Sequence, residues 1–69
     1  MPKKIRELKA MLRKAGFLYR PGKGSHTIWG HPALRDKIAL SGAEGDDAQP
    51  YQEKDVQEIL RKLKEVQDE

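Results

Sequence analysis

Apolar residues recur at helical spacing in two stretches of this 69-residue chain, and that pattern constrains its fold more than any other feature. Between residues 3 and 15, neighbouring apolar side chains are three or four residues apart and so share one face of a helix. The stretch from about residue 52 to residue 66 repeats this spacing in Val56, Ile59, Leu60, Leu63 and Val66. Each helix must cover its apolar face, so the residues between the two helices must supply a second layer.

Glycine and proline divide the middle of the chain into short segments. Three segments are rich in β-branched, aromatic and aliphatic residues, and we predict that they form strands. They are residues 17–20, 26–31 and 36–41, separated by turns at 22–25 and 32–35 and followed by a loop at 41–50. The predicted fold is α+β in the order α-β-β-β-α. A three-stranded antiparallel sheet carries both helices on one face, in a single domain over residues 1–69.

Composition excludes several classes of protein. The chain has no cysteine, so it has neither disulfides nor thiolate zinc sites. No apolar run approaches the ~20 residues of a membrane span, and the first residues lack the apolar stretch of a secretory signal. We therefore expect a cytoplasmic protein with no membrane partner and no cofactor.

Charge is distributed unevenly along the chain. Residues 1–37 carry ten bases and two acids, a net charge of +8, whereas residues 38–69 carry four bases and nine acids, a net charge of −5. A strongly basic half is typical of proteins that bind a polyanion such as nucleic acid. The alternative is an ordinary lysine-rich helix face in contact with solvent.

The stretch Gly22-Lys23-Gly24-Ser25-His26 is the strongest candidate for a functional site. Glycines allow a sharp turn that exposes backbone N–H groups, and these groups together with Lys23 could hold an anion. Ser25 could orient the histidine or a ligand, and His26 could exchange protons near neutral pH. The alternative is a plain hairpin turn followed by a surface histidine.

The second histidine, His31, precedes a proline, and we expect it to be structural. His26 and His31 are five residues apart, so on one regular strand they would point to opposite faces and lie roughly 16 Å apart. That separation argues against an acid–base pair and against a metal site formed by the two histidines.

Trp29 is the only tryptophan, and strand alternation puts it on the face opposite Ile28. If Ile28 meets Ile38 and Leu40 beneath the helices, Trp29 lies on the open face of the sheet. An exposed tryptophan there could contact RNA or a partner protein. Alternatively, strand twist tucks Trp29 against one of the two tyrosines.

Three short segments of this chain resemble, in sequence and in order, segments of the HicA family. HicA proteins are small toxins of bacterial toxin–antitoxin pairs. A basic first helix ends in Lys14-Ala15-Gly16-Phe17, then Lys23-Gly24-Ser25-His26 opens the second strand and His31-Pro32 closes it. The resemblance covers nearly the whole chain. It implies a fold like that of double-stranded-RNA-binding domains, an mRNA-cleaving activity that does not need the ribosome, and His26 as the catalytic residue. The implied partner is the antitoxin HicB, which would cover the toxin's active surface.

We therefore predict a metal-independent endoribonuclease of the mRNA interferase type. His26 would take a proton from a ribose 2′-hydroxyl or deliver one to the leaving oxygen. Lys23, the N–H groups of the turn, Arg20 and Lys37 would stabilise the charge that develops on the phosphate. Two alternatives remain open: a non-catalytic RNA-binding module, and a protein-interaction module that uses the open face of the sheet.

Overall fold

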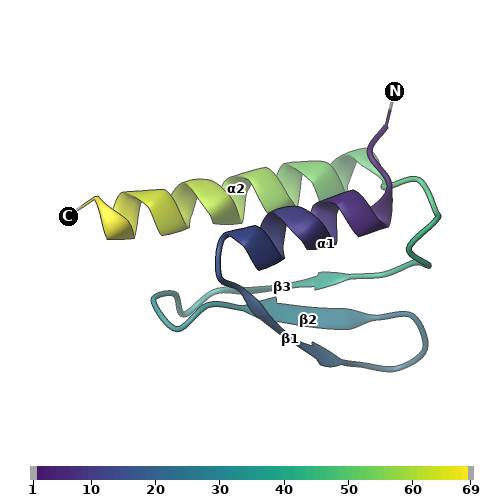
Figure 1. Cartoon of the computed structure of the whole chain (residues 1–69), viewed down its shortest axis with the longest axis horizontal. Coiled ribbons are helices and arrows are strands. Elements are labelled where there is room, and N and C mark those ends of the chain that lie inside the picture. The colour runs from purple at the N-terminus through teal and green to yellow at the C-terminus, as the bar shows by residue number, and fades with distance from the viewer. Residues whose placement is uncertain (1, 69) are drawn as a thin grey trace.

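The computed structural model describes residues 2–68 as two helices lying on the same side of a three-stranded sheet (Figure 1). In chain order the elements are α1 (Ile5–Lys14), β1 (Leu18–Pro21), β2 (Thr27–Gly30), β3 (Lys37–Leu40) and α2 (Pro50–Gln67). The α-β-β-β-α order, the antiparallel sheet and the placement of both helices on one face are all confirmed. The arrangement is consistent with a fold like that of double-stranded-RNA-binding domains.

The sheet has the order β1-β2-β3, so β2 is central and the other two strands form its edges. Directly paired residues of antiparallel strands share a face of the sheet. Two rows therefore face the helices: Tyr19–Trp29–Ile38 and Pro21–Thr27–Leu40. Two other rows form the open face: Leu18–Gly30–Lys37 and Arg20–Ile28–Ala39. Pro21 lacks a backbone N–H, and its position at the end of an edge strand suits that loss.

The second helix begins earlier than its apolar pattern predicted, at Pro50 rather than near residue 52. Proline suits the first position of a helix, where its missing N–H has no intrahelical partner to lose. The side chain of Gln52 then accepts a hydrogen bond from the Gln49 N–H (2.8 Å) and donates one to the Ser41 carbonyl (3.0 Å). The second bond ties the start of α2 to the end of β3. Within residues 2–68, neither helix combines the length and apolar content needed to cross a membrane.

The hydrophobic core lies between the helices and the sheet. Its buried members come from both helices, from β2 and β3 and from the loops that adjoin them: Ile5, Leu8, Leu12, Phe17, Trp29, Leu40, Ala48, Val56, Ile59 and Leu63. Ile38 and Leu60 are partly buried against this cluster. The two apolar helix faces predicted from residue spacing are thus the faces that pack on the sheet.

The open-face placement predicted for Trp29 is wrong. Its side chain is 0% exposed, and its ring stacks on Tyr19 with 4.9 Å between the ring centroids. Trp29 shares a row with Ile38, so the premise that Ile28 meets Ile38 in the core was incorrect. Burying the larger indole removes more apolar surface from water, and its N–H is satisfied by the Thr27 hydroxyl (2.8 Å). A buried Trp29 cannot be an RNA or partner contact in this structure.

The acidic loop before α2 holds the start of α1. The carbonyl oxygens of Asp46 and Glu44 accept hydrogen bonds from the first N–H groups of that helix, at 2.9 and 3.1 Å. These N–H groups have no intrahelical partner, so the loop supplies the missing acceptors. The carboxylate of Asp47 pairs with Lys4, and that of Glu44 lies 3.8 Å from the ammonium of Lys9. The acidic residues therefore neutralise part of the basic first helix.

Candidate functional site

The turn between β1 and β2 presents His26 at the surface. The Gly22 N–H donates to the His26 carbonyl (2.8 Å), and the His26 N–H donates to the Lys23 carbonyl (3.0 Å). Gly24 has a φ of +59°, a left-handed conformation that glycine adopts without the steric cost that a side chain would bring. The two hydrogen bonds and the left-handed glycine together reverse the chain within five residues.

Ser25 anchors this turn to the rest of the molecule. Its Oγ accepts a hydrogen bond from the N–H of Gly42, in the loop after β3 (3.1 Å). Among residues 2–68, no hydrogen bond joins Ser25 to the His26 imidazole, so Ser25 positions the turn rather than the ring. The N–H groups of Lys23, Gly24 and Ser25 find no acceptor within the same residues. They remain available to an anion outside the chain.

The His26 side chain lies on the open side of the hairpin. A Cβ built on Gly22 would stand 3.4 Å from the Cβ of His26, so the two residues face each other across the turn. Strand alternation puts His26 on the same face as Ile28, opposite Thr27. His26 is exposed, and its imidazole makes no hydrogen bond or ion pair with the described part of the chain. The ring is therefore accessible to a ligand.

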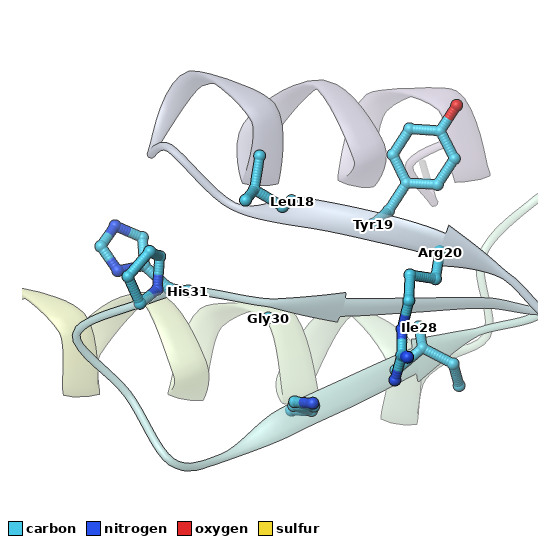
Figure 2. Close-up of a pocket in the computed structure, with 8 residues that line it drawn as sticks. Leu18, Tyr19, Arg20, Ile28, Gly30 and His31 are labelled. Atoms are coloured by element: carbon cyan, nitrogen blue, oxygen red, sulfur yellow. The ribbon is translucent and has the colours of Figure 1, made fainter.

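A groove of about 290 Å³ crosses the open face of the sheet beside this hairpin (Figure 2). It is lined by Leu18, Tyr19, Arg20, Ile28, Gly30, His31, Pro32 and Lys37. Arg20 extends from β1 beside its partner Ile28 on β2, as Figure 2 shows. The stem of Lys37 lies across Gly30, because a Cβ added there would come within 3.2 Å of the Lys37 Cγ. The absence of a side chain at Gly30 thus makes room for the lysine over the floor of the groove.

The three cations of the hairpin and groove differ from three lysines on the helix side in whether a carboxylate lies beside them. Lys4, Lys9 and Lys62 on the helix side each lie beside a carboxylate. The hydrogen bond that Lys62 donates to Asp36, followed by the negative charge of Asp36, raises the pKa of Lys62 above its ordinary value of 10.5. Arg20, Lys23 and Lys37 instead form no ion pair with any of residues 2–68, and no carboxylate lines the groove. These three cations of the hairpin and the open face thus carry charge that no carboxylate of the described chain offsets, as do Arg6, Arg13 and Lys14 of α1.

His31 lies at one end of the same groove, directly after β2 ends at Gly30. Its ring meets Phe17 edge-on with 5.3 Å between centroids, and its Nδ1 accepts a hydrogen bond from the Ala33 N–H (3.0 Å). His31 is therefore a structural residue, as expected, that also borders the groove.

Comparison with known protein families matched residues 5–66 to the family described as the HicA toxin of bacterial toxin-antitoxin. The chain belongs to the HicA family. No curated protein and no solved structure was found to match it. The match confirms the resemblance seen in the sequence, and it makes this chain a toxin of a toxin–antitoxin system, which implies an antitoxin partner.

In this HicA toxin, the residues predicted to act on RNA fall into two groups. Lys23, Gly24, Ser25 and His26 lie together in the turn, whereas Arg20 and Lys37 lie in the groove. Trp29 belongs to neither group because it is in the core.

The sequence did not predict the apolar side of the groove, formed by Leu18 and Ile28, or that His31 borders the groove. Strand alternation already put Leu18 on the same face as Arg20, so the sequence carried a signal for that residue. The sequence carried no such signal for Ile28. Its face depends on whether Ile28 or the adjacent Trp29 enters the core.

Proposed function

We propose that this HicA toxin is an endoribonuclease that cleaves mRNA independently of the ribosome, with His26 as its acid–base residue. The observation that carries this proposal is the exposed His26 imidazole, which has no partner among the described residues and sits in a turn with three unused N–H groups. An mRNA substrate puts its site of action in the cytoplasm.

The chemistry needs one nucleophile that is already part of the substrate. Neutral His26 takes the proton of a ribose 2′-hydroxyl as the 2′-oxygen attacks the adjacent phosphorus. The bond from phosphorus to the 5′-oxygen breaks, leaving a 2′,3′-cyclic phosphate on one product and a 5′-hydroxyl on the other. The leaving oxygen takes its proton from the imidazolium or from water. No step in this scheme uses a metal ion.

Charge that develops on the phosphate requires donors that are already in place. Lys23 and the N–H groups of residues 23–25 are closest in sequence to the imidazole, and Arg20 and Lys37 add positive charge on the same face. Donors that need no rearrangement stabilise the transition state more than mobile ones do. Their arrangement supports phosphate chemistry at the turn.

The antitoxin is, on this proposal, a HicB-like protein that covers the turn and the neighbouring groove. The groove supports this because it combines unpaired cations with the exposed apolar side chain of Leu18. Covering it would remove that apolar surface from water and block access to His26.

The test compares the purified wild-type chain with His26→Ala on an end-labelled single-stranded RNA. We expect His26→Ala to lower the cleavage rate by about 100-fold or more, the typical contribution of a general acid–base residue. Gln57→Ala, on the exposed side of α2, is the control and should cleave as wild type. EDTA should leave the wild-type rate unchanged, because residues 2–68 contain no cluster of three or more potential metal ligands. Cleavage by His26→Ala at the wild-type rate would show that the assignment is wrong.

A further inference from the structure

We infer that the groove on the open face binds one nucleotide of a single-stranded RNA, next to the nucleotide on which His26 acts. The inference rests on the proposed function in taking RNA as the ligand and in placing the neighbouring nucleotide at His26. Its new content is the surface used, the residues that form the subsite, and the requirement for an unpaired base.

The position of the groove relative to His26 supports this assignment. Ile28 follows His26 by two residues on the same face of the hairpin, a distance of ~6.6 Å along an extended strand. Gly30, at the floor of the groove, follows two residues later. A chain of nucleotides bound at the turn would therefore continue directly into the groove along β2.

The lining of the groove matches the chemistry of a nucleotide. Each of the two open-face rows carries one cation, on β1 in one row and on β3 in the other, together with at least one apolar side chain. In one row Arg20 lies on β1 beside Ile28, and in the other Leu18 lies on β1 while Lys37 lies on β3. The two cations thus stand diagonally on opposite sides of β2, with Ile28 on that central strand and Leu18 near Arg20 on β1. A base can cover Leu18 and Ile28 while the flanking phosphates meet Arg20 and Lys37.

An unpaired base is required because the apolar surface must meet a face of the base. In a duplex both faces of each base are covered by stacked neighbours, whereas in a single strand they are accessible to side chains. Leu18 is 70% exposed, so this apolar surface has no cover within the described chain. The volume of about 290 Å³ is near the lower end for small-ligand sites, which suits one nucleotide.

The charge of the open face suits RNA, and Arg6, Arg13 and Lys14 of α1 also form no ion pair within residues 2–68. Lys4 and Lys9 are beside carboxylates of the acidic loop, which lowers the net charge that α1 offers to a polyanion. Arg20 and Lys37 have no such neighbour among the ion pairs of residues 2–68. The open face is thus complementary in charge to RNA.

The experiment measures binding of the full chain to a single-stranded RNA carrying 2′-O-methyl groups, which removes the nucleophile and so prevents cleavage. Each cation that contacts a phosphate contributes about 0.7 to the slope of log K against log salt concentration. That slope corresponds to about fivefold in affinity at 0.1 M salt, relative to 1 M salt. We expect Arg20→Ala/Lys37→Ala to lower the slope by about 1.4 and to weaken binding about 25-fold. Leu18→Ala should weaken binding about fourfold for each methylene that the base covers, with no change in slope.

Controls separate this surface from its rivals. Lys54→Ala, on the exposed side of α2, removes one positive charge and should change neither affinity nor slope beyond error. Arg6→Ala/Lys14→Ala removes two exposed cations of α1 and should have a smaller effect than the groove pair. A duplex of the same sequence should bind more weakly than the single strand.

The inference is overturned if the groove variants bind the methylated RNA as wild type does, or if the α1 pair causes the larger loss. It is also overturned if the groove variants lose antitoxin binding but keep RNA binding, since the groove would then serve only a protein. Because the probe is never cut, failure of this inference is distinct from failure of the catalytic role of His26, which is read from cleavage of unmodified RNA.

Discussion

Replacing Trp29 by alanine tests the arrangement of the core most directly. The indole is 0% exposed, stacks on Tyr19 and donates a hydrogen bond to Thr27. Deleting a buried tryptophan typically costs about 3–5 kcal/mol, through lost transfer free energy and the cavity left behind. A 69-residue chain has a free energy of unfolding of roughly 3–10 kcal/mol, so this one change removes a large share of it.

The expected effect on melting is correspondingly large. For a domain of this size each 1 kcal/mol shifts the melting temperature by about 4–8 °C, so Trp29→Ala should melt at least about 12 °C below wild type. Thermal unfolding followed by circular dichroism, together with urea unfolding, measures both quantities. Trp29→Phe should lose less, because it keeps an aromatic ring in the core and the Thr27 hydroxyl keeps its contact with the Leu40 carbonyl (3.4 Å).

Tyr51→Ala is the control, since that ring is 59% exposed on α2 and its loss should cost less than about 0.5 kcal/mol. A Trp29→Ala protein that melts within about 4 °C of wild type would refute the buried placement. The open-face position that strand alternation allows would then be correct, and RNA binding rather than stability should respond to the substitution.

Two further predictions concern the turn and the surface. Gly24→Ala should lower the free energy of unfolding, measured in urea, by about 1–2 kcal/mol, because the left-handed φ of +59° disfavours a side chain. A clash is not the cause, since a Cβ at Gly24 would meet no atom within 4 Å. An unchanged free energy of unfolding would contradict the turn geometry. The raised pKa of Lys62 means that its bond to Asp36 stabilises the fold below pH 10.5 and that this contribution is lost as pH rises through the higher folded-state pKa. Asp36→Asn should therefore have a lower free energy of unfolding than wild type in urea titrations at neutral pH. In strongly alkaline solution the two proteins should have the same free energy of unfolding. A difference that persists there would contradict the assignment.

Local patterns were sufficient for the secondary structure and for the location of the turn. Apolar spacing of three and four residues identifies a helix wherever it occurs, and glycine and proline break strands regardless of what surrounds them. The helix faces, the order of the strands and the exposure of His26 could all be predicted for this reason. The start of α2 at Pro50 was missed because the proline was read as a loop residue rather than as a first helical residue.

The role of the acidic loop could not be predicted, because it depends on residues distant in sequence. Asp47 pairs with Lys4 across 43 residues, and the loop carbonyls cap the first helix. Charge counted along the chain indicated that the basic half would bind a polyanion. The folded molecule shows that part of that charge, on Lys4 and Lys9, already lies beside carboxylates of the acidic loop.

The sequence by itself determined the elements, their order, the HicA family and an exposed histidine in a glycine turn, because each of these follows from local chain geometry or a contiguous motif. Only the tertiary structure decided which face of β2 is buried. Ile28 and Trp29 are adjacent and both apolar, so alternation allows either to enter the core. The helices cover the face that holds the larger indole, and Ile28 is left beside Arg20 in the groove. That choice depends on the total area buried between layers, which is not a property of any local segment.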